Sequence, residues 1–272
     1  MILPAKGFRW QGNSEFMKAI GIIPARLEAS RFPNKPMALI HGMPMIGHCY
    51  HRTRIALGLD NVYVATCNEE IASYVNSIGG SSVMTETSHT RATTRTAEAM
   101  KKIEVANEER VDVVVMVQGD EPLISPKTIE ETLVHFKDPS VEIVNIMSRL
   151  HTYEQFIDKN NVKVVVNQKN DALYFSREPV PSPWKGIEDI PMYMQTGIIA
   201  FRRDVLLRFN QMSESSLEQI ESVDMNRVLE AGGRIRMVLT ELTTIGVDTP
   251  QELADVDELM KSDSTINDYL MI

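Results

Sequence analysis

The sequence predicts an α/β fold in which a doubly wound, mostly parallel sheet carries helices on both faces. Over most of the 272 residues, short apolar runs alternate with amphipathic segments of helical length, as in successive β–α–β units. Residues 111–117 are almost unbroken valine, which is typical of a strand buried on both faces of a parallel sheet. Hydrophobic residues make up 43% of the chain, enough for one large domain or for a domain with a smaller lobe.

The first half of the chain is the regular part of this pattern. Each helix predicted there has about the length of a β–α–β crossover. We expect strands at residues 19–24, 61–66, 81–85 and 111–117, and helices at residues 45–57, 69–78 and 93–107.

The second half is less regular. The segment "REPVPSPWKGIEDIP", residues 177–191, holds too much proline for a central strand and predicts a loop or a lobe boundary. Further on, "EAGGRI" indicates a helix that ends on glycines before a strand. We expect strands at residues 142–150, 162–166, 172–176, 194–201 and 235–242, and helices at residues 203–210, 220–231 and 250–260.

These elements predict one domain at residues 17–262, to which about residues 142–200 contribute a small lobe. Residues 1–16 have neither the long apolar centre of a secretory signal nor a helical period, and a second methionine follows at Met17. We therefore interpret them as a leader derived from an expression vector. Residues 263–272 are expected to form a C-terminal tail.

Composition argues against several classes of protein. The net charge of −9 disfavours a protein that coats nucleic acid, because binding phosphate backbones requires a basic face. No apolar run approaches the roughly 20 residues that cross a bilayer, so we expect no membrane partner. The two cysteines, Cys49 and Cys67, indicate a reducing compartment, and we expect a cytoplasmic protein.

A cationic loop follows the first predicted strand. The segment "IIPARLEASRFPNKP", residues 22–36, contains two arginines, one lysine and three prolines, and it lacks a glycine-rich phosphate cradle. An isolated cluster of charges is usually a solvated surface, but the prolines would stiffen this loop enough to wrap a triphosphate. We interpret Arg26 and Lys35 as phosphate ligands, with Arg31 as a candidate third.

Two carboxylates are expected at the same edge of the sheet, because ligands of open α/β sheets bind beyond the carboxyl ends of the strands. Asp120 in "VMVQGDEPLI" ends a buried strand, although a plain turn would explain the same pattern. In "IGVDTPQELADV", Thr249 and Pro250 are a helix-start signal that leaves Asp248 unexplained. Two carboxylates that face a cationic loop are typical of a Mg²⁺ site for nucleotidyl transfer.

Five segments together resemble a known family. In order, "IIPARLEASRFPNKPMALIHGMPMIGH", "VYVAT", "VQGDEPLI", "ALYFSREPVP" and "GVDTPQEL" resemble the nucleotidyltransferases that activate acidic sugars with CTP, most closely the CMP-Kdo synthetases (3-deoxy-manno-octulosonate cytidylyltransferases). The resemblance runs from about residue 19 to residue 254. It implies a nucleotidyltransferase sheet with a small α/β dimerisation lobe, a homodimer, and Mg²⁺ dependence. It also implies transfer of CMP from CTP to the anomeric hydroxyl of a 2-keto-3-deoxy sugar acid, with release of pyrophosphate, for cell-surface polysaccharide synthesis.

The resemblance assigns roles to individual positions. Arg26 and Lys35 match phosphate-binding residues, and Asp120 and Asp248 match the metal-binding carboxylates. Arg177 matches a residue near the sugar acid, whose carboxylate suits a bidentate guanidinium; alone it would be interpreted as a surface arginine. The other positions that we predict to bind substrate are Arg31, Thr66, Arg95, Gln118, Gln195, Glu218 and Glu221.

The sequence also departs from the family pattern on the base side and the sugar side. Cys67 stands where an aspartate is usual, and Thr94 in "HTRATTR" replaces a carboxylate. Gln195-Thr196-Gly197 replaces the usual His-Leu-Gly, and Asp224-Met225-Asn226 lies where Leu-Glu-Gln-Leu is typical. The phosphate and metal positions are retained, so we expect the same reaction with a modified or different acid sugar.

Three alternatives stay open beside this interpretation. The first is a cytidylyltransferase for another acid, such as a nonulosonate or a phosphonate. The second is a catalytically silent nucleotide-binding homologue, to which the altered loop at residues 89–96 gives some weight. The third, a nicotinamide-dependent oxidoreductase, is disfavoured because "IIPARLEASR" stands where Gly-x-Gly-x-x-Gly would be required.

Overall fold

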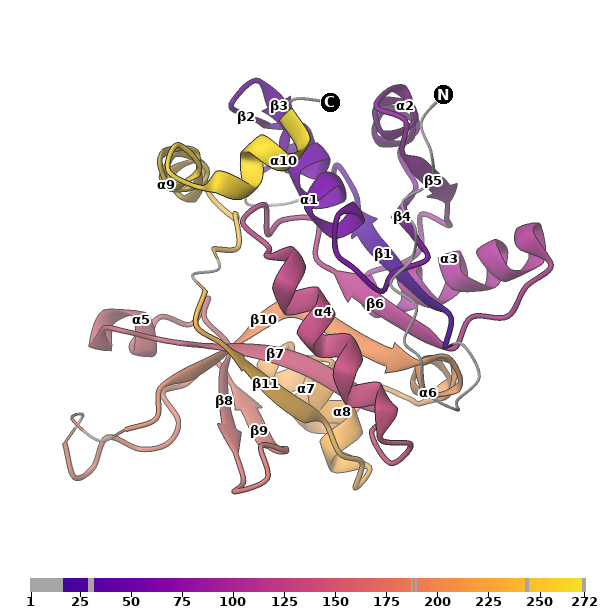
Figure 1. The fold of residues 1–272 in the computed structure, drawn as a ribbon. Coiled ribbons are helices and arrows are strands. Elements are labelled where there is room, and N and C mark those ends of the chain that lie inside the picture. The colour runs from indigo at the N-terminus through magenta and orange to yellow at the C-terminus, as the bar shows by residue number, and fades with distance from the viewer. Residues whose placement is uncertain (1–16, 29–31, 187, 189, 243–244, 271–272) are drawn as a thin grey trace.

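A single twisted sheet forms the centre of the computed structural model, which describes residues 17–28, 32–186, 188, 190–242 and 245–270 (Figure 1). The main path of the sheet has the strand order β11-β7-β10-β6-β1-β4-β5. Its strands are β1 (Ala19–Ala25), β4 (Asn61–Thr66), β5 (Ser81–Met84), β6 (Val113–Val117), β7 (Ile143–Arg149), β10 (Tyr193–Arg202) and β11 (Arg236–Thr240).

The sheet is mainly parallel, as the sequence predicts. The pairs β1–β4, β1–β6, β4–β5 and β7–β11 are parallel. Strand β10 lies between β6 and β7 and runs antiparallel to both. One reversed strand therefore joins a regular parallel half to the less regular second half of the chain.

A smaller group of elements extends from the β10 side of the sheet. Strands β8 (Lys163–Val166) and β9 (Ala172–Ser176) form an antiparallel pair, and β8 also pairs with β10. With the short helix α5 (Tyr153–Ile157), they project away from the main path of the sheet in Figure 1. A separate two-stranded sheet consists of β2 (Leu39–Ile40) and β3 (Met43–Pro44).

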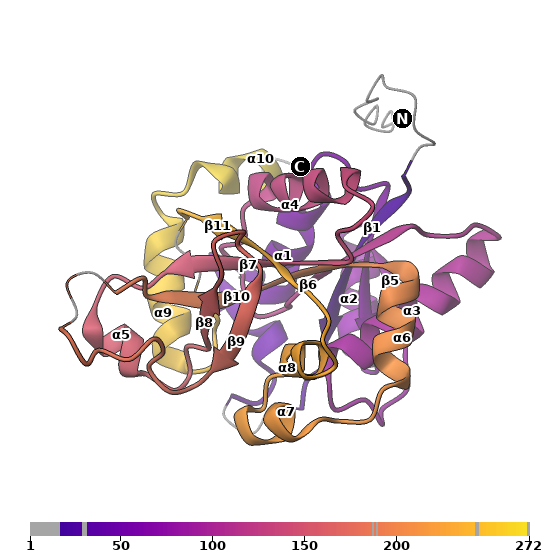
Figure 2. The ribbon, with the colours of Figure 1, turned by 90° about the horizontal axis from the view of Figure 1, so that it is seen from below.

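Helices cover both faces of the sheet, and Figure 2 shows α4 and α6 on opposite sides of it. Side chains alternate along each strand, so Ile23 and Val115 join one hydrophobic cluster while Ile22 and Val114 join the other. The first cluster includes residues of α1 (Met45–Arg54), α2 (Glu69–Ser77), α4 (Pro126–Val134), α9 (Pro250–Met260) and α10 (Asn267–Leu270). The second includes residues of α3 (Ala92–Asn107), α6 (Arg203–Gln211) and α8 (Met225–Glu230).

The prediction of one continuous helix at residues 220–231 is wrong. The structure has α7 (Ser216–Glu221) and α8 there, with Ser222 between them in the left-handed region at φ 54°. A left-handed residue ends an α-helix, because its carbonyl and amide groups no longer continue the hydrogen-bond pattern. The segment expected to be a tail contains α10, whose Tyr269 is buried.

Within the described ranges, none of the helices combines the length and the apolar character that crossing a membrane requires.

The strand order also places a binding site. The chain leaves β1 toward β4 on one side, whereas β6 pairs with β1 on the other side. Ligands of open α/β sheets bind where the strand order diverges in this way, beyond the carboxyl ends. The loops that follow β1 and β6 therefore lie side by side at one edge. Gly119 permits this approach, since a Cβ there would lie 3.0 Å from the carbonyl oxygen of Pro24.

Candidate active site

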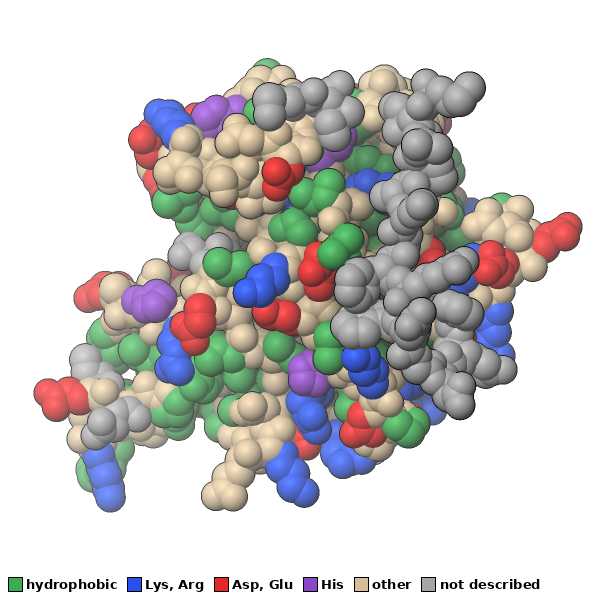
Figure 3. Space-filling view, in the orientation of Figure 1, with side chains coloured by type: hydrophobic (Ala, Val, Ile, Leu, Met, Phe, Trp, Pro, Cys, Tyr) green, Lys and Arg blue, Asp and Glu red, His purple; other side chains and the backbone are tan. Residues whose placement is uncertain are grey.

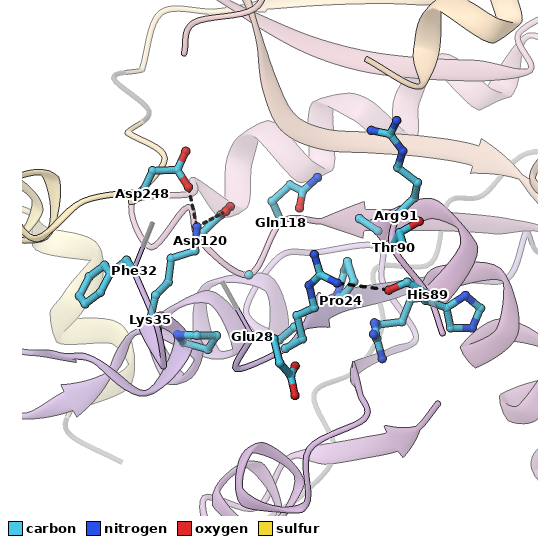
Figure 4. A pocket seen from close by; sticks show the side chains of 16 residues that line it. Pro24, Glu28, Phe32, Lys35, His89, Thr90, Arg91, Gln118, Asp120 and Asp248 are labelled. Atoms are coloured by element: carbon cyan, nitrogen blue, oxygen red, sulfur yellow. Dashed lines mark hydrogen bonds and ion pairs between the residues drawn. The ribbon is translucent and has the colours of Figure 1, made fainter. Parts of the chain in front are cut away.

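A pocket of about 320 Å³ opens at this edge, beyond the carboxyl ends of β1 and β6 (Figure 4). Its volume lies within the usual range for small-molecule sites. Residues from four separate parts of the chain line it. They are Pro24, Ala25, Arg26, Glu28, Phe32, Lys35, Pro36, His89, Thr90, Arg91, Ala92, Arg95, Gln118, Gly119, Asp120 and Asp248.

Two carboxylates and one ammonium group meet at one end of the pocket. Lys35 Nζ lies 2.8 Å from Asp120 Oδ2 and 2.8 Å from Asp248 Oδ1, as Figure 4 shows. The Lys35 side chain is only 12% exposed, and both aspartates are about one-third exposed. Burial opposes the charged lysine, but the negative charges of Asp120 and then Asp248 outweigh it and raise the pKa of Lys35. The ammonium group therefore stays protonated between the carboxylates.

Backbone contacts hold the two aspartates at this spacing. Val247 N donates to Asp120 O at 2.8 Å, which joins the turn after β6 to the segment that precedes α9. Thr249 is the N-cap of α9, and its side chain and that of Glu252 form a capping box. Glu252 Oε2 also accepts from Asp248 N at 2.7 Å. Glu252 therefore both caps α9 and holds the backbone of Asp248.

The cationic loop is braced by a residue that the sequence analysis did not single out. Asn68, just after β4, accepts from Leu27 N at 3.0 Å and donates to Glu28 Oε1 at 3.1 Å. Asn34 N then donates to Leu27 O at 3.0 Å and closes the loop next to Lys35. The available signal was the position of Asn68 at a strand's carboxyl end. Arg31, the candidate third phosphate ligand, lies outside the described residues.

The opposite end of the pocket is built on the start of α3. Arg26 Nη1 donates to His89 O at 3.4 Å. The His89 ring contacts Thr94 Oγ1 at 3.0 Å and also pairs with Glu98. Burial opposes ionisation of Glu98, but hydrogen bonds from Lys102 and His89 lower its pKa to about 2. An ionised Glu98 therefore holds the imidazole ring and, through it, the loop beside Arg26.

Arg95 presents a buried donor at this end. It lines the pocket and is only 3% exposed. Its Nη1 donates to Thr85 Oγ1 at 2.5 Å, whereas Nη2 is buried without a hydrogen-bond partner among the described residues. A buried donor of this kind normally has a partner, which a water molecule or a ligand acceptor in the pocket would supply. This placement agrees with the substrate-binding role predicted for Arg95.

Several predicted substrate residues do not line the pocket, because they are engaged elsewhere. Arg177 donates from Nε to Glu221 O at 2.7 Å and from Nη1 to Lys159 O at 2.8 Å. The Glu221 carboxylate accepts from Tyr174, Ser176 and the backbone of Arg177, which joins β9 to α7. The structure therefore places Arg177 and Glu221 outside the lining of this pocket.

The remaining predicted residues also lie away from the pocket lining. Glu218 is fully buried and forms an ion pair with Arg227 at 2.5 Å. Thr66 is buried at the end of β4, where its hydroxyl accepts from Asn68 N at 3.1 Å. Gln195 lies in β10, and its Oε1 is buried without a partner among the described residues. Gln118, in contrast, lines the pocket.

The donor set of the pocket fits a hard divalent ion. Within the described part of the chain, no group of three or more His, Cys, Asp and Glu residues could hold a metal alone. Mg²⁺, however, usually takes one or two protein carboxylates and completes its shell with substrate phosphates and water. Asp120 and Asp248 converge on the single positive charge of Lys35, so they are placed to converge on a cation.

Comparison with known proteins gives a consistent result. The family model described as Cytidylyltransferase matches residues 20–236. The 3-deoxy-manno-octulosonate cytidylyltransferase of Geobacter metallireducens is 41% identical over 253 residues, which cover 89% of this chain and 97% of that protein. The Escherichia coli protein of the same name is 39% identical, with 92% and 99% covered.

A solved structure agrees with these relatives. The structure of CMP:2-keto-3-deoxy-manno-octonic acid synthetase complexed with CTP matches with a TM-score of 0.82 and 39% identity, covering 90% of this chain and 98% of that one. The chain therefore belongs to the cytidylyltransferase family, and within it to the 3-deoxy-manno-octulosonate cytidylyltransferases, or CMP-Kdo synthetases.

Proposed function

We propose that this protein transfers CMP from CTP to the anomeric hydroxyl of 3-deoxy-manno-octulosonate (Kdo) and releases pyrophosphate, supplying an activated sugar for cell-surface polysaccharides. The observation that carries this proposal is the convergence of Asp120 and Asp248 on Lys35 inside a pocket at the carboxyl ends of β1 and β6. The names of the relatives support the acid sugar, and the CTP complex of the similar structure supports the nucleotide.

The cationic residues of the pocket act on the phosphates. Arg26 and Lys35 bind the triphosphate and stabilise the charge that builds up on the leaving pyrophosphate. Both side chains come from the loop that Asn68 braces, so they are held in place before the reaction begins. Arg95 and Gln118 bind the nucleotide from the opposite end and the floor of the pocket.

The carboxylates of Asp120 and Asp248 are the proposed ligands of Mg²⁺. When bound, Mg²⁺ neutralises charge at the reacting phosphate and lowers the pKa of the attacking hydroxyl. The two aspartates orient the reacting groups for an in-line attack, and no covalent intermediate on the protein is required.

The acid sugar is proposed to bind on the side of β10 and α7. Arg177 and Gln195 are the proposed contacts of the sugar acid. Glu218 and Glu221 support this side through their bonds to Arg227 and to β9. Two of the departures from the family pattern, at residues 195–197 and 224–226, lie on this side, so any difference in the acid that is accepted should arise here.

We further propose that two copies associate and that the protein works in the cytoplasm. Large apolar side chains are exposed on the smaller group of elements and on the segment that follows it: Ile157 of α5 is 45% exposed, Leu173 of β9 is 57% exposed, and Trp184, between β9 and β10, is 88% exposed. Hydrophobic side chains gather on the lower left of the face in Figure 3, the region that α5, β8 and β9 occupy in Figure 1. Exposed apolar surface of this kind is typical of protein interfaces. The free cysteines Cys49 and Cys67 fit a reducing compartment.

The proposal is tested by measuring pyrophosphate release with CTP and a panel of acids. We expect turnover that requires CTP, Kdo and Mg²⁺ together and stops when EDTA is added. A nonulosonate or a phosphonate that turns over while Kdo does not would replace the substrate assignment. Calorimetric binding of CTP, with no release of pyrophosphate from CTP in the presence of any acid of the panel, would show a silent nucleotide-binding protein instead. Efficient turnover with Kdo, and with no other acid of the panel, would refute a changed acid specificity.

A further inference from the structure

The turn after β6 and the bulge in β10 are joined by a reciprocal pair of hydrogen bonds. Gln118 N donates to Gly197 O at 2.9 Å, and Gly197 N donates to Glu121 Oε1 at 2.5 Å. Gly197 lies where the register of β10 against β7 shifts. One residue of the bulge therefore holds both ends of the four-residue turn that contains Asp120.

Gly197 cannot be replaced by a larger residue without moving this turn. A Cβ at Gly197 would lie 2.6 Å from both Cβ and Cγ of Gln118 and 2.7 Å from Glu121 Oε1. Asn145 fixes the bulge from the neighbouring strand, because its Nδ2 donates to Thr196 O at 3.2 Å and to Ile198 O at 2.8 Å. The bulge is thus held in place by β7, and the turn that contains Asp120 is hydrogen-bonded to it.

Glu121 makes this contact at a cost to stability. The residue is only 9% exposed, and its Oε2 is buried without a hydrogen-bond partner among the described residues. A buried polar atom without a partner destabilises the folded state. Departures of this kind from optimal packing concentrate at functional sites.

The same turn sets the distance between the two proposed metal ligands. Asp120 O accepts from Val247 N at 2.8 Å, and Asp248 directly follows Val247 in the chain. A shift of the turn therefore changes where Asp120 lies relative to Asp248. Mg²⁺ demands near-ideal ligand geometry, so a small shift is sufficient to weaken binding.

We infer that Glu121 is a positioning residue, which holds the Asp120 turn against Gly197 so that Asp120 and Asp248 reach one divalent ion. The inference rests on the proposed metal site. It assigns Glu121 no contact with the substrate or the ion. Side chains that orient metal ligands in this way typically change metal affinity or activity about 10- to 100-fold when they are removed.

The test compares Glu121→Ala, Glu121→Gln and the wild type by three measurements: Mn²⁺ binding by electron paramagnetic resonance with CTP present, pyrophosphate release, and thermal unfolding. We expect Glu121→Ala to weaken Mn²⁺ binding about tenfold or more and to lower kcat. Its Tm should also fall, because Gly197 N loses its acceptor, and removing the unpartnered Oε2 offsets only part of that cost. Glu121→Gln keeps an oxygen for Gly197 N and should retain most of the Mn²⁺ affinity.

Glu104→Gln is a matched control. The Glu104 side chain is 12% exposed and pairs with Arg203 near the end of α3, about 14–18 Å along that helix from the pocket-lining residues at its start. It should lower Tm and leave Mn²⁺ affinity unchanged, so it separates a loss of stability from a loss of metal binding.

Two results would overturn the inference. One is equal Mn²⁺ affinity in the wild type, Glu121→Ala and Glu121→Gln. The other is a parallel loss of Tm and Mn²⁺ affinity in both Glu121 variants, which would indicate a purely structural role. If the wild type releases no pyrophosphate, the proposed function fails, and the Mn²⁺ comparison still decides the role of Glu121.

Discussion

At the scale of single residues, the carboxyl-end rule predicts much of the pocket. Lys35, Asp120 and Asp248 come from three separate segments, and the structure brings them within hydrogen-bond distance, as expected for loops that share one edge of a sheet. The rule places Asn68 and Glu121 at the same edge of the sheet, but it does not give their roles. Their contribution depends on which neighbour each side chain reaches, and no sequence pattern specifies such contacts.

The first prediction concerns the charges at the metal end of the pocket. Asp120→Asn, Asp248→Asn and Lys35→Met should each lower kcat by about 10²-fold or more, because each removes a group that acts on the charge of the reacting phosphates. Steady-state pyrophosphate release with CTP and Kdo measures the effect. Lys261→Met is the control, since Lys261 is exposed and pairs with Glu258 at the end of α9.

Near-native turnover of either asparagine variant would show that the ion is not held by that aspartate. Circular dichroism should show folded protein for all three variants, because each affected side chain lies in the pocket rather than in either hydrophobic cluster.

The second prediction concerns the pH dependence of stability. His48 is fully buried and bonds to Tyr269 Oη and Ile40 O, both at 2.8 Å. Burial, reinforced by the nearby positive charge of Arg52, lowers the pKa of His48 from 6.5 to about 4. Between these values the unfolded chain binds a proton that the folded protein does not. Stability should therefore fall as pH drops from about 6.5 to 4, by up to about 3 kcal/mol from this residue.

Urea unfolding at several pH values tests this expectation. The loss of stability across that window should be smaller in His48→Gln, which has no titrating group at this position, than in the wild type. Identical pH slopes for the two proteins would contradict the prediction.

At the scale of elements, the predicted bounds match the structure best where the local sequence carries a strong start or stop signal. The predicted bounds of β4, β9 and α9 are confirmed, and α9 carries the clearest signal, with a capping box and a proline in its first turn. The break between α7 and α8 was missed because Ser222, unlike glycine, does not signal a left-handed residue. The bulge in β10 was also missed, since it depends on packing against Asn145 and Glu121.

The third prediction uses the capping box of α9. Thr249→Ala removes the acceptor of Glu252 N and should cost about 1 kcal/mol of unfolding free energy. Because Asp248 directly precedes this cap, the Mg²⁺ concentration for half-maximal activity should also rise. Thr152→Ala removes the equivalent cap of α5, whose residues do not line the pocket.

Urea unfolding and a Mg²⁺ titration of both variants separate the two effects. We expect a similar loss of stability in each and a changed Mg²⁺ dependence in Thr249→Ala alone. An unchanged Mg²⁺ dependence in Thr249→Ala would mean that the cap does not position Asp248.

At the scale of the whole molecule, the alternation of apolar runs and helices was sufficient to predict the mainly parallel sheet, because strands buried on both faces leave a strong pattern. The position of β10 between β6 and β7 was not predictable. Strand order in the second half depends on which edges meet after folding, and local sequence does not encode that choice.

The fourth prediction concerns association of two chains. Trp184 is 88% exposed, so Trp184→Glu should leave the fold of one chain intact and disrupt the proposed interface. Light scattering is expected to give twice the mass of the chain for the wild type and a lower mass for this variant. Val105→Glu is the control, because Val105 is 80% exposed on α3. A monomeric wild type would refute the proposed homodimer.

The most direct test of the account is to locate the divalent ion. We predict that crystals grown with CTP and Mn²⁺ show an anomalous diffraction peak at coordination distance, roughly 2.1–2.3 Å, from carboxylate oxygens of both Asp120 and Asp248. The peak should be lost in Asp248→Asn. An ion bound to the nucleotide alone, or to neither aspartate, would contradict the proposed site.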